Sequence, residues 1–167
     1  MTKLTWEPMR LSDLPTVNAI ADRVHLDYPE DPAVFAERLD KAPFGCFVLK
    51  EGSTAHGYII SHPWLYKKPP ELNTLLGELS AKADTYYIHD IALLPEARGG
   101  GHAGQITEQL VSVARARGID NLSLVAVNNS VPFWTKSGFT VVDDPALAQK
   151  LLSYDEDARF MVRKITA

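Results

Sequence analysis

Cysteine is almost absent from this chain, since Cys46 is the only one in 167 residues. A single cysteine cannot form an internal disulfide, so we expect a reducing environment, for which the cytoplasm is the default location. Cys46 lies inside the apolar stretch from Phe44 to Leu49, where we interpret it as a buried small hydrophobic residue rather than as a nucleophile.

Long apolar runs and concentrated charge are also missing. No segment has the character of a signal peptide or a membrane span, so we expect no membrane partner. Lysine and arginine together number 17 against 21 for aspartate and glutamate, and no basic run is dense enough for a nucleic-acid partner. Neither repeats nor low-complexity linkers divide the chain, so we expect one domain over residues 1–167, without a metal.

Along the chain, segments whose apolar residues follow a strand pattern alternate with segments whose apolar residues have helical spacing. Apolar runs bounded by turn residues predict strands, and apolar residues at helical spacing predict helices. Strands are predicted at 4–9, 44–50, 55–61, 86–93, 121–127, 139–142 and 159–165, and helices within 11–24, from 32, and within 105–118, 130–137 and 145–152, with another short one within 71–83. This order predicts an α/β (α+β) domain with a mixed sheet, helices on both faces and a closing antiparallel hairpin.

A glycine-rich loop lies between the strand at 86–93 and the helix at 105–118. It contains Arg98, the three successive glycines Gly99, Gly100 and Gly101, and then Gly104. Backbone N–H groups converge where such a loop enters a helix, and the helix dipole adds partial positive charge there. Glycines also let a phosphate approach the backbone closely. The loop therefore predicts an anion site, most simply for a pyrophosphate; the alternative is a flexible turn before a surface helix.

Two named phosphate motifs do not explain this loop. Residues 99–104 match G-x-G-x-x-G, but that motif should follow its strand at once, and an acidic residue should end the next strand. Here residues 94–98 intervene, and the next strand ends in Asn128. The Walker pattern is absent because no Gly-Lys-Ser/Thr occurs. A dinucleotide-dependent oxidoreductase is therefore a distant hypothesis.

A different motif covers the whole stretch. Here a strand and Pro95-Glu96 precede the pattern Arg98-x-x-Gly101-x-Ala103, and an amphipathic helix follows it. This pattern resembles the acetyl-CoA motif of the GCN5-related N-acetyltransferase family, R/Q-x-x-G-x-G/A. Phe133 to Phe139 resembles the later family segment F-Y-E-K-L-G-F. The resemblance implies a single-domain fold with a mostly antiparallel twisted sheet and splayed central strands, and acetyl-CoA as co-substrate.

The resemblance also implies a set of cofactor-binding residues. The strand is expected to bulge at Ile91, Ala92 and Leu93 and to pair with the pantetheine arm of the cofactor. Asn128 ends the next strand, where it either holds cofactor amides or is simply a strand-end asparagine. The full expected set is Ile91, Ala92, Leu93, Arg98, Gly99, Gly100, Gly101, His102, Ala103, Gly104, Asn128, Phe133 and Trp134.

His89 is the expected general base for removing a proton from an attacking amine. An unperturbed imidazole titrates near pH 6.5 and so accepts a proton at neutral pH. Tyr87 should share its face of the strand, while Asp90 should point to the other face unless the bulge redirects it. These three residues form the expected catalytic group; the alternative for His89 is a structural role.

Trp134 is the clear departure from the family pattern, which usually has tyrosine there to protonate the departing thiolate. An indole N–H has no proton to give up at neutral pH. Either Tyr154, Ser130 or water serves as the acid, or this step proceeds unassisted. Trp134 itself is expected to be a wall of the thioester pocket or part of the core.

The favoured function is transfer of an acetyl group from acetyl-CoA to a primary amine of a small molecule, by direct attack in a ternary complex, in a monomer or homodimer. Two alternatives remain open: a non-catalytic acyl-CoA sensor on the same fold, and a peptide or protein amine acetyltransferase. The long connection from His62 to Asp84 either walls the acceptor pocket or is a surface excursion. Its aromatic residues Trp64 and Tyr66 could hold a small amine.

Overall fold

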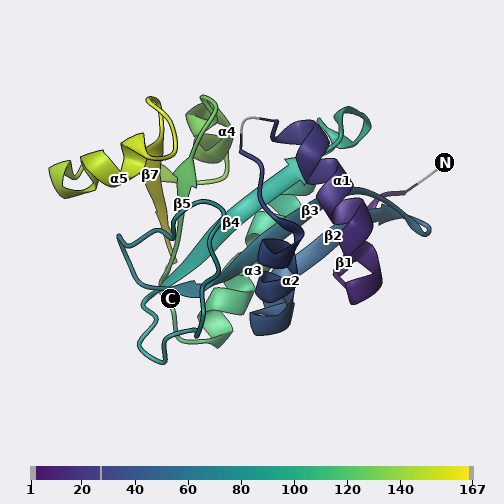
Figure 1. Cartoon of the computed structure of the whole chain (residues 1–167), viewed down its shortest axis with the longest axis horizontal. Helices are drawn as coiled ribbons and strands as arrows, with labels where there is room; N and C mark the ends of the chain where they lie inside the picture. Colours follow the sequence, from purple (N-terminus) through teal and green to yellow (C-terminus); the bar gives the residue numbers. More distant parts are fainter. Residues whose placement is uncertain (1–2, 27, 166–167) are drawn as a thin grey trace.

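The computed structural model describes residues 3–26 and 28–165, so the ends of the expected domain and residue 27 lie outside the described part. Seven strands form one sheet in the order β1-β2-β3-β4-β5-β7-β6 (Figure 1). Only the β4–β5 pair is parallel. The strands are β1 Thr5–Pro8, β2 Cys46–Glu51, β3 Thr54–Trp64, β4 Thr85–Leu93, β5 Asn121–Ala126, β6 Thr140–Val141 and β7 Arg159–Lys164. The predicted mixed, mostly antiparallel sheet and its closing β6–β7 hairpin are thus confirmed.

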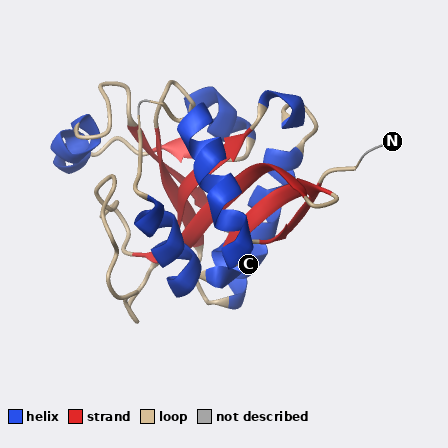
Figure 2. Ribbon diagram, turned by 45° about the vertical axis from the view of Figure 1, so that its right-hand side comes forward, coloured by secondary structure: helices blue, strands red, loops and turns tan. Residues whose placement is uncertain are grey.

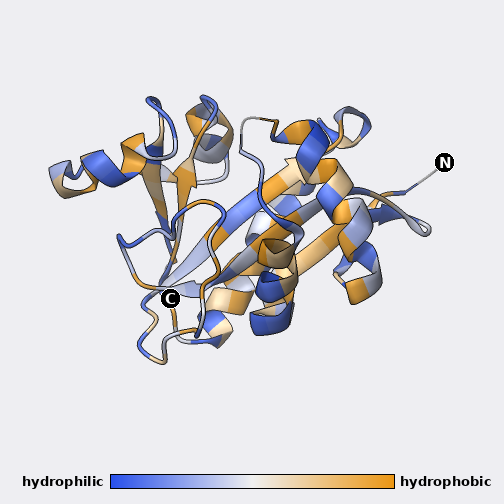
Figure 3. Ribbon diagram, viewed as in Figure 1, coloured by the Kyte–Doolittle hydropathy of each residue, from blue (hydrophilic) through white to orange (hydrophobic). Residues whose placement is uncertain are grey.

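Helices cover both faces of the sheet (Figure 2). One apolar core joins α1 and α2 to one face through residues such as Val17, Phe35 and Tyr58. A second core joins α3 to the other face through Ile106 and Leu110. Figure 3 shows the hydrophobic residues concentrated on the strands between these layers. The helices are η1 Leu11–Asp13, α1 Leu14–Val24, α2 Pro32–Lys41, η2 Pro43–Gly45, η3 Pro95–Ala97, α3 His102–Ala116, α4 Val131–Lys136, η4 Pro145–Leu147 and α5 Ala148–Leu152.

The two central strands part soon after they meet. β4 pairs with β5 only at Tyr86–Leu122 and Tyr87–Ser123. Beyond that point β5 stays paired with β7 along all six of its residues, so it follows β7 and leaves β4. Figure 1 shows β4 and β5 diverging toward the end of the molecule that carries α4. The splayed central strands that the resemblance implied are therefore present.

The bulge in β4 lies at His89, not at residues 91–93. Ile60 opposes Asp90 while Ser61 opposes Ile88, so β4 holds one residue more than β3 at this point. The expected bulge at Ile91–Leu93 is wrong, because these residues continue the regular pairing with β3. The extra residue lets His89 and Asp90, although adjacent, both face the layer of α1 and α2.

The connection between β3 and β4 contains no helix among its described residues, so the short helix predicted within 71–83 is wrong. Its leucines do not form a buried stripe, since Leu75 is 56% exposed. β3 itself runs on to Trp64, three residues beyond its predicted end at Ser61. Cys46 is fully buried, as predicted, and burial raises the pKa of its thiol to about 12, which makes it a poor nucleophile.

Candidate functional site

The gap between the diverging strands forms a cavity of about 480 Å³. One wall is β4 from Ile88 to Leu93, and the opposite wall is Leu124 and Val125 of β5. α4 and the end of α1 complete it. The lining residues that sequence analysis predicted are His89, Asp90, Ile91, Ala92, Leu93, Arg98, Asn128, Phe133 and Trp134. The structure thus gathers residues from opposite halves of the chain around one cavity.

Backbone groups of β4 line this gap. The Leu94 N–H donates to the His56 carbonyl on β3, so the alternating residues Ile91 and Leu93 direct their backbone groups away from β3. The Ile91 carbonyl accepts a hydrogen bond from His25 Nε2 at 3.1 Å, and the Leu93 carbonyl accepts one from Arg98 Nε at 2.9 Å. The N–H groups of Ile91 and Leu93 therefore point into the gap, where β5 no longer pairs with β4.

The glycine loop has the geometry of an anion site. Gly99 and Gly101 have φ values of 84° and 79°, in the left-handed region that favours glycine. α3 starts directly after Gly101, and no described side chain caps its first turn. A Cβ added at Gly99, Gly101 or Gly104 would meet nothing within 4 Å. Together with Arg98, the open first turn fits a diphosphate.

His102 and Ala103 lie at the start of α3, within this loop. The His102 ring folds back over the loop, so that a Cβ added at Gly100 would come within 2.8 Å of its Nε2. The His102 carbonyl accepts a hydrogen bond from Trp6 Nε1 at 2.9 Å, which attaches the loop to β1. The residues predicted for the phosphate site are therefore contiguous in space as well as in sequence.

Trp134 is both core and cavity wall. It is 6% exposed, and its ring packs edge-on against Phe133 and Phe139, with centroids 5.0 and 5.5 Å away. Asn128 also lines the cavity, in a left-handed conformation with φ 55°. Its backbone N–H donates to Asp155 Oδ2 at 3.2 Å, which fixes the end of β5.

His89 forms a buried pair with Glu30, which lies in the connection between α1 and α2. His89 Nε2 is 2.9 Å from Glu30 Oε1, and the two side chains are 6% and 7% exposed. Burial acts to raise the pKa of Glu30, but the hydrogen bond and charge of His89, the Asn73 N–H and the charge of Arg38 outweigh it, and the pKa is lowered. A carboxylate only accepts, so in the neutral ring Nε2 carries the proton and Nδ1 carries the lone pair.

Asp90 forms a second pair, on the same face as His89. Asp90 Oδ1 is 2.7 Å from His25 Nε2, and Asp90 Oδ2 accepts a hydrogen bond from the Tyr58 hydroxyl. Asp90 is expected on the opposite face unless the bulge redirects it, and the bulge at His89 does redirect it. With both oxygens engaged, Asp90 is placed to hold His25 rather than to accept a proton from an amine.

Tyr87 is fully enclosed and lies on the face shared by His89. Its hydroxyl is hydrogen-bonded to Tyr154, whose own hydroxyl donates to the Pro70 carbonyl. Burial raises the pKa of Tyr87 well above its usual value and that of Tyr154 to about 12. Neither tyrosine lines the main cavity, so Tyr154 is poorly placed to be the acid that Trp134 does not supply.

A smaller cavity of about 60 Å³ lies on the α1/α2 side of His89. Its walls include Tyr28, Glu30, Pro70, Leu72 and Tyr154, so the connection from His62 to Asp84 does wall it. Trp64 and Tyr66 take no part in either cavity: the Trp64 Nε1 donates to the Lys68 carbonyl at 2.7 Å, and the Tyr66 ring lies 5.8 Å from that of Phe160.

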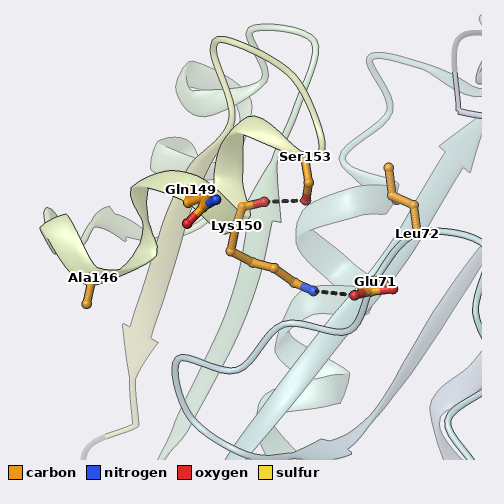
Figure 4. A pocket seen from close by; sticks show the side chains of 6 residues that line it. All are labelled: Glu71, Leu72, Ala146, Gln149, Lys150 and Ser153. Carbon is orange, nitrogen blue, oxygen red and sulfur yellow. Dashed lines mark hydrogen bonds and ion pairs between the residues drawn. The ribbon is translucent and has the colours of Figure 1, made fainter.

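Ion pairs tie this connection to the opposite half of the molecule. Lys67 Nζ is 2.8 Å from Asp144, and Lys150 Nζ is 3.7 Å from Glu71. The second pair crosses a surface groove of about 640 Å³ beside α5 (Figure 4). The segment that covers the small cavity therefore contacts α5 and the N-cap residue of η4 through these two surface pairs.

No sequence pattern indicated His25, Glu30 or Arg38 as site residues. His25 and Glu30 lie between two helices, where no periodic pattern distinguishes a functional side chain. Arg38 belongs to the helical pattern of α2, yet its side chain is fully buried, and Nη1 donates to the Thr74 carbonyl at 2.9 Å. In the part of the chain that the structure describes, no cluster of residues has the arrangement of a metal site, and no helix is long and apolar enough to cross a membrane.

Comparisons with known proteins agree with this geometry. The family model described as acetyltransferase (GNAT) family matches residues 7–139. No significant match is found among curated protein sequences. Among solved structures, Ard1 from Thermoplasma volcanium is 16% identical, with a TM-score of 0.74 over 98% of this chain and 99% of that one.

Two further structures share the fold. The ribosomal-protein-S18-alanine N-acetyltransferase from Escherichia coli is 18% identical, with a TM-score of 0.68 over 99% of this chain and 96% of that one. The N-acetylglutamate synthase from Neisseria gonorrhoeae, in complex with coenzyme A and N-acetyl-glutamate, is 16% identical, with a TM-score of 0.71 over 100% of this chain and 36% of that one. At these identities the likeness establishes the fold.

Proposed function

This chain belongs to the acetyltransferase (GNAT) family and is an acyltransferase; we propose that it transfers an acetyl group from acetyl-CoA to the primary amine of a small molecule. The observation that carries the proposal is the gap between β4 and β5, which extends from Arg98, directly before the glycines, to His89. A phosphate group fits the end at Arg98, and the thioester of an extended arm fits the end at His89.

The residues present fit acetyl-CoA, which supplies an activated acyl thioester when it binds. Arg98 and the open first turn of α3 would hold the diphosphate. The N–H groups of Ile91 and Leu93, together with the Asn128 side chain, would pair with the amide groups of the pantetheine arm. An N–H donor beside the thioester would also polarise its carbonyl. Phe133 and Trp134 close the apolar side of the same cavity.

His89 would accept the proton from the attacking ammonium. It lines both the main cavity and the small one, so its ring stands between the cofactor side and the acceptor side. Glu30 holds Nε2–H, which leaves the Nδ1 lone pair to accept the proton, directly or through water. The carboxylate then stabilises the imidazolium that forms.

The small size of the acceptor cavity supports a small-molecule amine. Its volume of about 60 Å³ and its cover from residues 70–72 leave space beside His89 for a small amine. Glu30 and Asp90 in its walls favour a cationic acceptor. A peptide or protein acceptor would require residues 65–84 to move away.

Trp134 supports one second candidate, a non-catalytic acyl-CoA sensor, because no tyrosine stands at that position to protonate the leaving thiolate. One experiment separates the two functions. The purified protein is titrated with acetyl-CoA in a calorimeter, and thiol release is then followed against a panel of small amines and short peptides. Release with a small amine supports the proposal, saturable binding without release supports the sensor, and absence of binding contradicts both.

A further inference from the structure

A histidine outside the predicted site lies in the wall of the main cavity. His25 follows directly after α1 and lines the cavity together with Ile91, Ser130 and Trp134. Its Nε2 contacts two acceptors, Asp90 Oδ1 at 2.7 Å and the Ile91 carbonyl at 3.1 Å. Because both partners only accept, Nε2 carries a proton, and any second proton of the ring sits on Nδ1.

From this geometry we propose that His25 is the general acid of the transfer, supplying the proton that the indole of Trp134 cannot give. The inference rests on the proposed function. As the bond between the amine nitrogen and the acyl carbon forms, the carbon–sulfur bond breaks and its electron pair goes to sulfur. The sulfur then takes the proton from His25 Nδ1. The ring is left neutral with its Nε2–H still bound to Asp90, so no hydrogen bond is lost in the transfer.

The surroundings of His25 favour its charged form. Its backbone N–H donates to the Ala21 carbonyl at the C-terminus of α1, where the helix dipole favours a cation. Burial acts to lower the pKa of the ring, but the hydrogen bond and charge of Asp90, the Ile91 carbonyl and the charge of Glu30 outweigh it, and the pKa is raised. The Tyr58 hydroxyl fixes the other oxygen of Asp90.

The small cavity connects this acid to the base. His25 and His89 both line it, and its other polar walls include Tyr28, Glu30 and Asp90. The ammonium loses two protons as it becomes an amide. Both leave through His89: one goes to solvent, and the other replaces the proton that His25 gave to sulfur, so one turnover leaves both rings as they began.

The first test compares pH–rate profiles. The rate of the wild-type protein should fall at high pH as His25 loses its Nδ1 proton. His25→Gln should lower kcat by about 10- to 100-fold and remove this alkaline limb, with the dissociation constant for acetyl-CoA changed less than threefold. His56→Gln, a change on the outer part of β3, is the matched control and should behave as the wild type. A retained alkaline limb in His25→Gln, or an equal loss of rate in Ser130→Ala, would overturn the assignment.

The second test needs no turnover. In the ligand-free protein, an NMR titration of the His25 ring, assigned by its absence in His25→Gln, should show a midpoint above 6.5 that falls in Asp90→Asn. An unmoved midpoint in Asp90→Asn contradicts the role given to that pair. Failure of the proposed function looks different, because the wild type would then release no thiol with any amine, whereas failure of the acid assignment leaves wild-type turnover intact.

Discussion

His89 Nε2 lies 2.9 Å from Glu30 Oε1, and this contact joins the bulge of β4 to the connection that precedes α2. Glu30→Gln removes the charge that orients and stabilises the protonated ring. We expect kcat to fall by about 10- to 100-fold and the acidic limb of the pH–rate profile to move to lower pH. Steady-state kinetics across pH, with thiol release as the signal, measures both.

The control for this change is Glu71→Gln, an exposed carboxylate that pairs with Lys150 at 3.7 Å. A surface pair of this kind contributes little to the free energy of folding, so kcat of Glu71→Gln should stay within twofold of the wild type. If Glu30→Gln changes kcat with no movement of the acidic limb, Glu30 supports the fold around His89 and does not act through its charge.

His62 makes the stability of the fold sensitive to acid. It is buried, its Nδ1–H donates to the Pro63 carbonyl at 3.0 Å, and burial lowers its pKa to about 3. The unfolded chain binds a proton at this residue below about pH 6.5, and the folded chain does not, so stability falls as the pH falls. Between pH 6.5 and pH 5.0 this residue alone should remove roughly 1.5 kcal/mol.

Urea unfolding at both pH values measures this effect in the wild type and in His62→Asn, whose amide keeps a donor for the Pro63 carbonyl. The variant should be less stable at both pH values but should lose roughly 1.5 kcal/mol less than the wild type on acidification. His56→Asn is the control and should keep the wild-type loss. Equal losses in the wild type and in His62→Asn would remove His62 as the cause.

The first turn of α3 offers a direct test of the phosphate site. Gly104 lies inside the helix, its φ is not positive, and an added Cβ meets nothing within 4 Å. Gly104→Glu should therefore leave the fold intact while placing a carboxylate where the diphosphate binds. We expect the affinity for acetyl-CoA, measured by calorimetry, to fall at least about 30-fold, since like charges meet at a helix N-terminus.

Gln109→Glu is the matched control, because it adds the same charge to an exposed position further along α3. Its affinity for acetyl-CoA should stay within about twofold of the wild type, and circular dichroism should show both variants folded. Equal affinities of Gly104→Glu and Gln109→Glu would mean that this turn does not hold the phosphate.

If the proposed function holds, Leu72 limits the size of the acceptor. It lines the small cavity beside His89, so Leu72→Ala enlarges the space for the amine. We expect kcat/KM to rise several-fold for amines bulkier than the best wild-type acceptor and to fall for that acceptor, which loses contacts worth about 1 kcal/mol. Leu75→Ala, at a leucine that is 56% exposed, should leave the preference unchanged. If both variants rank the amines alike, the acceptor binds elsewhere.

Much of the fold was predictable from local patterns. Local sequence is enough to predict the glycine loop, the amphipathic helix α3 and the apolar strand β5. Each of them lies close to its predicted range. The leucines at 72, 75, 76 and 79 have a helical period that the structure does not use. Instead, the backbone N–H groups of Asn73, Leu76 and Gly77 donate to the carboxylates of Glu30 and Glu37, which holds this segment in an irregular course.

The candidate site was predictable only where residues are close in sequence. His89 and the residues proposed to bind the cofactor lie on β4, the glycine loop and α4, so local motifs are enough to propose them. The pairs His89–Glu30 and His25–Asp90 join residues 59 and 65 positions apart, counted as 89 − 30 and 90 − 25. Only the packing of α1 and α2 on the sheet creates them. The position of the bulge was likewise set by the pairing with β3, which no local pattern records.

The short junction between β4 and β5 has a mechanical consequence. Strands β4 and β5 pair at Tyr86–Leu122 and Tyr87–Ser123 alone. The sheet therefore consists of two parts, β1 to β4 and β5 to β7, which are joined at one end. A molecule that fills the gap between β4 and β5 contacts both parts of the sheet and resists their rotation relative to one another. Ligand binding should therefore slow amide hydrogen exchange in β4 and in β5 together. The substrate then stabilises the fold of the enzyme that consumes it.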